Sequence, residues 1–285
     1  YDAVNINEGM EQIKKRILDF QAVIIGDIPA VERNDVLKYC YAKKVRAYVI
    51  PKISDIILMG ADRIHVFDTP FMLSRGYTLS FDQRFGKRTL DIILSVLLLI
   101  AASPFMLLTA LAIKLYDHGP VFYSQVRCTK GGKEFAIYKF RSMIVDAEKK
   151  GGVQLAKEHD ERITPVGRVI RAARIDELPQ LFNILKGDMS FVGPRPERPE
   201  LIKEYSQEMP EFVFRMRVKA GLTGYAQVYG KYNTTALDKL KMDLLYIVNY
   251  SILVDFQILF ETVKIIFQKE STEGFTEEQK QKIEK

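Results

Sequence analysis

IILSVLLLIAASPFMLLTALAI, residues 92–113, is the stretch that decides the fold class, because it carries no charged side chain over 22 positions. At a rise of about 1.5 Å per residue, a helix of this length covers roughly 33 Å, enough to cross the hydrocarbon core of a bilayer. The run is apolar all the way round, which argues against the alternative, a buried helix of a soluble domain. Its internal position argues against a signal peptide. The sequence therefore predicts a membrane-associated helix.

Ser103 and Pro104 lie in the middle of this run and predict a break. A proline inside a helix removes a hydrogen bond and clashes with the preceding turn. The run has basic residues on both sides, and basic flanks favour the cytoplasm. We therefore expect a re-entrant helix over residues 90–115 that dips into the membrane and returns. A straight span, which would export one flank, is the alternative. The flanking cations are Arg84, Lys87, Arg88, Lys114, Arg127 and Lys130.

The bulk composition points to an anionic partner. The net charge is +6 and the sequence pI is about 9.1, which suits nucleic acid, a phosphorylated substrate or an anionic membrane surface. Cys40 and Cys128 are the only cysteines, too few for a disulfide framework, so a reducing, cytoplasmic setting is expected. The chain begins at Tyr1 rather than at a methionine, and we expect it to be a fragment or a processed form.

Residues 1–70 are interpreted as a small auxiliary, Rossmann-like α/β domain. Two short runs rich in β-branched residues, 22–26 and 46–51, flank a helical pattern in which Asn34 is a candidate N-cap. A strand–helix–strand order implies a parallel sheet, and residues 63–68 are expected to supply a third strand. No GxGxxG motif occurs, so dinucleotide binding has no support.

The remaining chain divides into a linker at 71–83, a catalytic-looking region at 84–268 and a polar tail at 269–285. The apolar stretch 234–268 carries three aspartates, so a packed or interfacial helix pair is expected there rather than a second membrane span. The expected fold class is an α/β auxiliary domain followed by a mainly α (α+β), membrane-associated catalytic domain with a re-entrant membrane helix.

RIDELPQLFNILKGDMS, residues 174–190, holds the clearest candidates for chemistry. Its apolar residues recur at helical spacing, Gly187 is a natural helix stop, and Pro179 is tolerated only in a first turn. The helix should therefore begin near Asp176 and Glu177, where free N–H groups and the helix dipole favour carboxylates. A simple acidic N-cap is the alternative interpretation of this pair.

Basic residues surround the pair of carboxylates in the sequence. Such a set can neutralise a polyphosphate and still leave an aspartate ionised as a nucleophile. A nucleic-acid surface is the rival interpretation, but it lacks interleaved aromatic residues and a recognised binding module. The cations are Arg168, Arg171 and Arg174 just upstream, Lys139 and Arg141 in YKFRSM, and Arg195 between two prolines in SFVGPRP, residues 190–196.

On these motifs, residues 84–267 resemble the monotopic polyprenyl-phosphate phosphoglycosyl transferases, the bacterial sugar transferase family. Residues 1–70 resemble the auxiliary domain of the large members, which also carry an N-terminal bundle of membrane helices. Three departures from the usual family pattern are Thr129 in place of Gly, Ala220 in place of Pro and Lys231 in place of Arg. The matching pieces are RFGKRTLDIILSVLLLIAASPFMLLTALAIKL, GPVFYSQVR, YKFRSM, RIDELPQLFNILKGDMSFVGPRP and AGLTGYAQVYG.

The resemblance implies a reaction and its residues. A UDP-sugar would give its phosphosugar to a polyprenyl (undecaprenyl) phosphate, releasing UMP, through a covalent phosphosugar on Asp176. Glu177 would assist as a base or in positioning, and Mg²⁺ would be held at Asp176. Ser103 and Pro104 would break the re-entrant helix. The expected phosphate ligands are Arg171, Arg195, Lys139 and Arg141.

The resemblance also implies partners and a location. The partners are a UDP-sugar, a polyprenyl phosphate and membrane lipid, without nucleic acid, and a homodimer is one option for assembly. The location is the bacterial inner membrane with the catalytic domain facing the cytoplasm, at the first membrane step of exopolysaccharide, capsule or O-antigen synthesis. Two other readings stay open: a membrane-tethered nucleotide-binding regulator without catalysis, and an ordinary glycosyl transferase that releases UDP.

Overall fold

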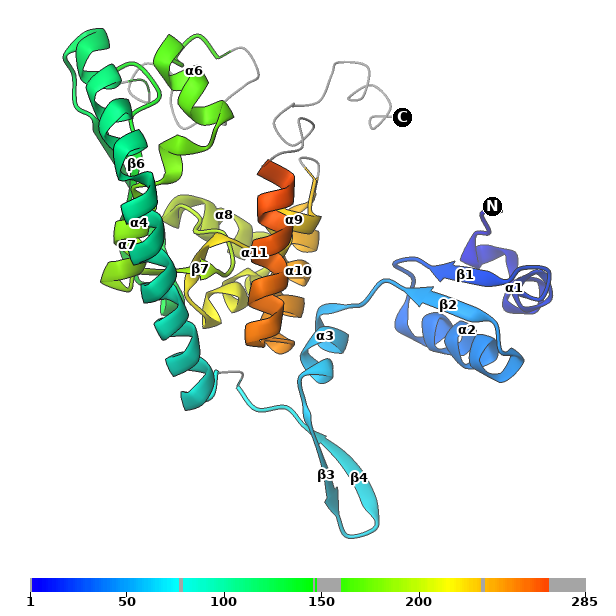
Figure 1. Cartoon of the computed structure of the whole chain (residues 1–285). Coiled ribbons are helices and arrows are strands. Elements are labelled where there is room, and N and C mark those ends of the chain that lie inside the picture. The colour runs from blue at the N-terminus through cyan, green and yellow to red at the C-terminus, as the bar shows by residue number, and fades with distance from the viewer. Residues whose placement is uncertain (1, 77–78, 146, 148–159, 232–233, 267–285) are drawn as a thin grey trace. The chain divides into compact units, whose positions relative to one another are not determined.

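The computed structural model describes residues 2–76, 79–145, 147, 160–231 and 234–266 (Figure 1). The chain divides into two compact units, Tyr1–Ile56 and Ile57–Lys285. The polar tail predicted at 269–285 lies outside the described residues.

The first unit is a strand–helix–strand motif. Strands β1 (Ala22–Ile25) and β2 (Arg46–Val49) pair in parallel, as predicted, and α2 (Ala30–Lys43) connects them. Asn34 is not the N-cap, because the helix begins four residues earlier and Pro29 occupies that position. Helix α1 (Met10–Ile17) follows the 3₁₀ turn Ile6–Glu8, and α3 (Ile53–Met59) follows β2. The buried core consists of Ile13, Ile17, Ile25, Val36 and Cys40.

The expected third strand forms, but it belongs to a separate hairpin. Strand β3 (Asp62–Val66) pairs antiparallel with β4 (Thr69–Leu73). Only two residues connect the strands, and Phe67 takes the left-handed conformation (φ 55°) that such tight turns require. Because closing so short a loop costs little entropy, β3 pairs with the segment that follows it. Residues 71–73, which the sequence analysis placed in a linker, are therefore part of β4.

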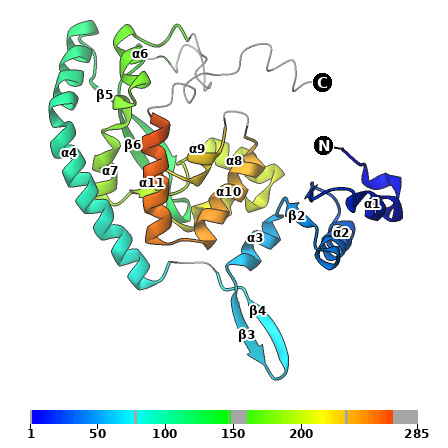
Figure 2. The ribbon, with the colours of Figure 1, turned by 45° about the vertical axis from the view of Figure 1, so that its right-hand side comes forward.

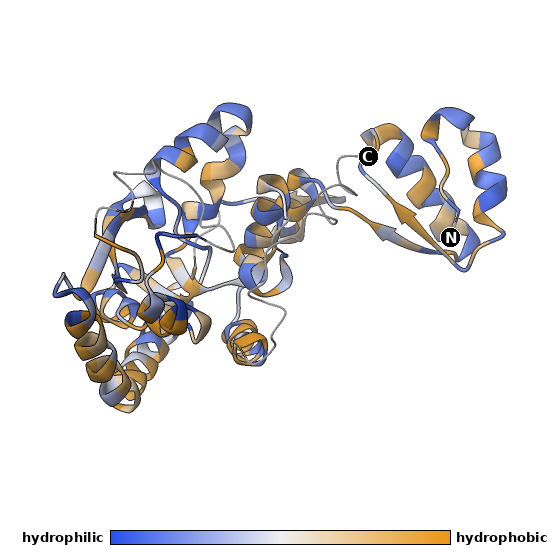
Figure 3. Cartoon of the chain, turned by 90° about the horizontal axis from the view of Figure 1, so that it is seen from above, coloured by the Kyte–Doolittle hydropathy of each residue, from blue (hydrophilic) through white to orange (hydrophobic). Residues whose placement is uncertain are grey.

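Helix α4 (Phe81–Asp117) is the one described helix that is long and apolar enough to cross a membrane. Ser80 caps its start, accepting from the N–H of Gln83, whose side chain accepts from the N–H of Ser80 in return. Only 11% of its most apolar 18-residue window is buried. Figure 3 shows hydrophobic residues over much of this helix, at the left of the view. An apolar surface of this extent has no reason to face water, so α4 is suited to a membrane.

The predicted break at Ser103 and Pro104 is wrong, because α4 runs through both residues as one helix. Pro104 has no N–H to donate to the carbonyl of Ile100, one turn earlier. The Ser103 hydroxyl donates to that carbonyl instead, at 2.9 Å. The freed acceptor is therefore satisfied and the helix continues, as a curve rather than as two helices (Figure 2).

The rest of the second unit places two small sheets and a set of short helices beside α4. Strands β5 (Phe122–Cys128) and β6 (Glu134–Phe140) form an antiparallel hairpin joined through a 3₁₀ turn, Lys130–Gly132. Strands β7 (Met189–Val192) and β8 (Ala220–Thr223) pair in parallel. The connecting elements are α6 (Pro165–Ala172), the 3₁₀ turn η3 (Ile175–Glu177), α7 (Gln180–Lys186), α8 (Pro199–Glu208), the 3₁₀ segment η4 (Pro210–Arg217) and α9 (Tyr225–Tyr229).

The predicted helix pair near the C-terminus is confirmed as α10 (Ala236–Val248) and α11 (Ile252–Ile266). Its aspartates explain why it packs as a pair. Asp255 of α11 is buried and accepts from Lys87 of α4 at 2.7 Å and from the Tyr246 hydroxyl of α10 at 2.8 Å. Tyr246 also receives a hydrogen bond from Lys87, at 3.0 Å. These three residues, the Lys87 cluster, join α4, α10 and α11.

Candidate active site

Asp176 and Glu177, the dyad, occupy the single 3₁₀ turn η3 between α6 and α7. The sequence pattern predicts a helix that begins at these residues, whereas α7 begins only at Gln180 with Pro179 as its N-cap. The difference comes from Arg174, whose left-handed backbone (φ 54°) ends the turn after α6. The carbonyl of Arg174 then accepts from the N–H of Glu177, which closes a tight turn before the helix.

Glu177 is held in place by β6. The Lys139 ammonium donates to its carboxylate at 2.7 Å. Burial alone would raise the pKa of Glu177, but Lys139, Arg195 and Arg174 outweigh that effect and hold the pKa at about 2. Lys139, predicted to bind a phosphate, is therefore committed in this structure to keeping Glu177 ionised and oriented.

Asp176 differs from its neighbour. In the described part of the chain no side chain donates a hydrogen bond to its carboxylate. Burial and the adjacent charge of Glu177 raise its pKa to about 6, while Lys139 and Arg171 act in the opposite direction. The dyad thus combines one carboxylate fixed by a cation with one that is ionised near neutral pH and open to a new partner, as a nucleophile requires.

Arg171 and Arg195 approach the dyad from different elements. Arg171 is in the last turn of α6, and its charge acts on Asp176. Arg195 follows β7, its side chain is exposed, and its charge acts on Glu177. Neither guanidinium has a partner among the described residues. Both are therefore available to an anion that reaches the dyad.

The loop that carries Arg195 is fixed through its backbone. The N–H of Gly193 donates to Thr223 at 2.9 Å, and the carbonyl of Pro194 accepts from Gly221 at 2.9 Å. Arg215, buried under the loop, donates to the carbonyl of Arg195 at 3.1 Å. The side chain of Arg195 is thus free while its backbone is anchored from below, so less order has to be created when a ligand binds.

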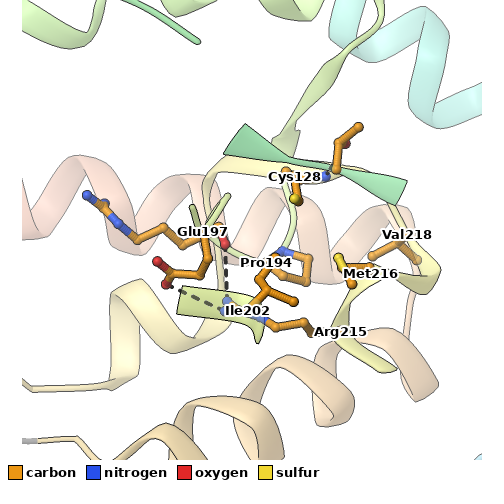
Figure 4. A pocket seen from close by; sticks show the side chains of 10 residues that line it. Cys128, Pro194, Glu197, Ile202, Arg215, Met216 and Val218 are labelled. Carbon is orange, nitrogen blue, oxygen red and sulfur yellow. Dashed lines mark hydrogen bonds and ion pairs between the residues drawn. The ribbon is translucent and has the colours of Figure 1, made fainter. Parts of the chain in front are cut away.

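Arg215 is the residue of this site that sequence reasoning missed. It is 4% exposed and forms ion pairs with Asp243 of α10 at 2.7 Å and with Glu197 at 3.5 Å. Figure 4 shows Arg215 and Glu197 in a small, mainly apolar pocket behind the loop. No sequence spacing connects these partners, because they come from separate elements. The pocket is lined by Cys128, Thr129, Pro194, Arg195, Glu197, Ile202, Arg215, Met216, Val218 and Ala220.

Thr129 and Ala220, two of the departures from the resembled family's pattern, contact each other in this pocket wall. The N–H of Ala220 donates to the Thr129 hydroxyl at 3.1 Å, and that hydroxyl donates to the carbonyl of Asp188 at 2.8 Å. A proline at position 220 would have no N–H to offer, and a glycine at 129 no hydroxyl. The two replacements therefore compensate each other.

Arg141 pairs with a carboxylate outside the dyad. Its guanidinium pairs with the carboxylate of Asp117 at the end of α4 and donates to the carbonyl of Pro120 at 2.6 Å. The side chain is 7% exposed. Arg141, which the sequence analysis assigned to a phosphate, instead holds the C-terminal end of α4 against β6.

The dyad could hold a metal only with help from a substrate. No group of three or more His, Cys, Asp or Glu side chains that could hold a metal ion occurs within the described residues. Mg²⁺, however, is commonly bound by one or two carboxylates together with substrate phosphates and water. The unbonded carboxylate of Asp176 fits that mode, whereas Glu177 is already engaged by Lys139.

Comparisons with known proteins agree with this arrangement. The family model described as bacterial sugar transferase matches residues 82–269. A UDP-N-acetylgalactosamine-undecaprenyl-phosphate N-acetylgalactosaminephosphotransferase of Aeromonas hydrophila is 46% identical over 242 residues, which are 83% of this chain and 56% of that protein. An undecaprenyl-phosphate glucose phosphotransferase of Komagataeibacter xylinus is 38% identical over 256 residues, 85% of this chain and 48% of that protein.

A third relative extends the range of sugars. An undecaprenyl-phosphate galactose phosphotransferase of Salmonella typhimurium is 35% identical over 238 residues, 78% of this chain and 49% of that protein. The chain thus spans about half the length of these curated relatives. The family match covers α4, the dyad, the loop of Arg195 and the helix pair together. On that match, the chain belongs to the bacterial sugar transferase family.

Proposed function

We propose that the chain transfers a phosphosugar from a UDP-sugar to undecaprenyl phosphate, giving a polyprenyl-diphosphate sugar and UMP. The relatives support this reading, since each is named for transfer to undecaprenyl phosphate. They are named for N-acetylgalactosamine, glucose and galactose, so the family match leaves the choice of sugar open among at least these three. The observation that carries the proposal is the unbonded carboxylate of Asp176 beside a neighbour that Lys139 keeps ionised.

The reaction runs as two displacements at one phosphorus atom. A carboxylate oxygen of Asp176 attacks the sugar-bearing phosphorus, the bond from that phosphorus to the bridging oxygen breaks, and UMP leaves with the bond's electron pair. An oxygen of the lipid phosphate then attacks the same phosphorus. The bond to Asp176 breaks, which regenerates the carboxylate and yields the diphosphate-linked sugar.

The residues around Asp176 divide the remaining work. Arg171 and Arg195 bind the phosphate oxygens, and the anchored backbone of Arg195 holds its guanidinium near that position in advance. Glu177, kept anionic by Lys139, positions the reacting groups. When bound at Asp176, Mg²⁺ supplies charge neutralisation on the diphosphate oxygens.

We further propose that α4 enters the bacterial cytoplasmic membrane and returns to the same side. Lys87 near its start is bonded to Asp255, and Asp117 at its end is paired with Arg141. Both partners belong to one folded unit, which cannot lie on both faces of a bilayer. Basic flanks favour the cytoplasm, where nucleotide sugars are made. Lys87 and Arg141 are thus both bonded within the protein.

The topology has a direct test. Single cysteines replace Asp82 or Lys130, both exposed and on opposite sides of the apolar run, in a background without Cys40 and Cys128. A thiol reagent that cannot cross membranes should label neither position in intact cells and both after lysis. Labelling of one position from outside would show that α4 spans the membrane.

The proposed reaction is tested by the nucleotide that leaves. The protein, Mg²⁺ and each of the three UDP-sugars are mixed without lipid acceptor. We expect about one UMP per protein and a phosphosugar that mass spectrometry locates on Asp176. Release of UDP would indicate an ordinary glycosyl transferase. Nucleotide binding without any release would indicate the regulatory protein instead.

A further inference from the structure

Arg174 has a backbone conformation that arginine rarely adopts. Its φ of 54° and ψ of 20° place it in the left-handed region, immediately before the turn that carries the dyad. A side chain with a Cβ pays a steric penalty there, whereas glycine is free of it and asparagine tolerates it better than most residues. The fold itself therefore gives no reason for an arginine at this position.

The side chain of Arg174 serves no other described residue. It is exposed, and no side chain or carbonyl in the described part of the chain is bonded to it. Buried arginines of the same unit are engaged, for example Arg141 with Asp117 and Arg215 with Asp243. An unpaired arginine at a surface is common by itself. An unpaired arginine kept at a strained position two residues from the dyad is not explained by packing.

The charges around the dyad leave a positive surplus on the side of Arg174. Lys139 neutralises Glu177 through their hydrogen bond, yet Arg174 and Arg195 both still act on Glu177. Arg171 lies on the side of Asp176. The charges of four cations and two carboxylates therefore act here, and the positive surplus favours an anion such as a diphosphate diester or a phosphomonoester.

From this arrangement we infer that Arg174 is a substrate-binding residue, whose guanidinium takes a phosphate oxygen at the dyad together with Arg195. The inference rests on the proposed function. The same chemistry can come from two sources: the diphosphate of the nucleotide sugar or the phosphate of the lipid acceptor.

The conformation supplies a test that separates binding from folding. Arg174→Asn removes the guanidinium but suits the left-handed backbone, so the melting temperature should stay the same or rise. Lys44→Asn is a matched control, because Lys44 is also an exposed cation with a left-handed backbone (φ 58°), at the end of α2. Arg174→Lys keeps the charge without the planar fork of donors.

Two measurements are made on the whole chain in lipid nanodiscs. The first is direct binding of UDP and, separately, of undecaprenyl phosphate. The second is the KM for UDP-sugar and for undecaprenyl phosphate in full turnover. For Arg174→Asn we expect a loss of roughly tenfold to a hundredfold in affinity for one of the two probes, with the matching KM raised. Arg174→Lys should recover part of the loss, and Lys44→Asn should equal the wild type.

The affected probe identifies the phosphate. A loss for UDP assigns Arg174 to the donor, and a loss for undecaprenyl phosphate assigns it to the acceptor. Either result supports the inference. Arg174→Asn that matches the wild type for both probes would overturn it, even if turnover proceeds as proposed. If the wild type binds both probes but releases no UMP, the proposed reaction is wrong. The affinities of the wild type and of Arg174→Asn for the two probes then still test the role of Arg174.

Discussion

The Lys87 cluster and the dyad both combine carboxylates with basic residues, but the cluster stabilises the fold and the dyad is available to a substrate. In the cluster, Lys87 and Asp255 are almost fully buried, and each bonds both the other and Tyr246. At the dyad, Glu177 has a cation, but no side chain in the described part of the chain donates to Asp176, and Arg171, Arg174 and Arg195 have no side-chain partner there. Side chains that are fully paired with one another stabilise the fold, whereas charged side chains without partners remain available to bind a substrate.

The difference follows from the cost of burying charge. A buried ion pair is tolerated only when each group is satisfied, and removing one partner leaves an uncompensated charge. Asp176 avoids that cost in part by a raised pKa, which lets it take a proton more readily than an exposed carboxylate would. A site poised for chemistry is therefore expected to be less stable locally than a site built for packing.

The largest effect is expected at the open site. Asp176→Asn should lower turnover roughly 10⁴-fold or more, because no other described group offers an unbonded carboxylate at the dyad. The Lys139–Glu177 bond remains, so circular dichroism should match the wild type and the melting temperature should not fall. Turnover within tenfold of the wild type would remove Asp176 from its proposed role.

The closed site should respond in stability. Lys87→Met leaves Asp255 buried beside a hydroxyl only, and the expected loss is about 3–5 kcal/mol of unfolding free energy. Lys87→Met combined with Asp255→Leu should recover much of that loss, since no charge is left unpaired. Denaturant unfolding in detergent measures both variants. Lys139→Met at the more exposed dyad is the comparison. An equal loss of unfolding free energy in that variant would show that the two sites do not differ in their contribution to stability.

Arg195→Ala should cost more activity than Arg198→Ala. The backbone of Arg195 is anchored by Arg215 and lies between two prolines, and its charge acts on Glu177. A charge-assisted contact to a phosphate contributes on the order of 1.5–3 kcal/mol, or roughly tenfold to a hundredfold in rate. The comparison is made in kcat/KM for the UDP-sugar. Equal small losses of kcat/KM in both variants would contradict a role for the anchored loop in positioning Arg195.

The raised pKa of Asp176 should also make the stability of the protein depend on pH. The pKa of Asp176 in the folded state, about 6, lies above the value of about 3.9 expected in the unfolded chain. The ionised form is therefore a penalty that is absent below pH 4, grows between pH 4 and 6, and is complete above pH 6. Asp176→Asn should thus add about 2 kcal/mol more to the unfolding free energy at pH 7 than at pH 4. Unfolding is measured with a metal chelator present, and a gain that does not change with pH would contradict the raised pKa.

The smallest expected effect concerns Thr129 and Ala220. Each of Thr129→Gly and Ala220→Pro removes one end of the hydrogen bond that joins them. Their combination should be more stable than the sum of the single losses by about 1 kcal/mol, because the second change removes a bond that is already gone. A double-mutant cycle in unfolding free energy measures this coupling. Additive losses would show that the two positions are independent.

The sequence by itself determined the features that depend on local pattern. Unbroken apolarity predicted α4, helical spacing interrupted by aspartates predicted the pair α10 and α11, and the adjacent carboxylates with arginines upstream located the dyad. These features need only neighbours within a few turns, since hydrophobic period and flanking charge act over that range. The parallel pairing of β1 and β2 was predicted for the same reason.

Only the tertiary structure decided which partners each side chain receives. It bonded Lys139 to Glu177, turned Arg141 toward Asp117, and satisfied the carbonyl before Pro104 with a serine hydroxyl, so that an expected break became a curve. Partners such as Arg215 and the carbonyl of Arg195 come from separate elements, and their meeting depends on how those elements pack. Sequence spacing carries no record of such contacts, because a hydrogen bond between distant residues forms only after the chain has brought them within 3 Å or so of each other.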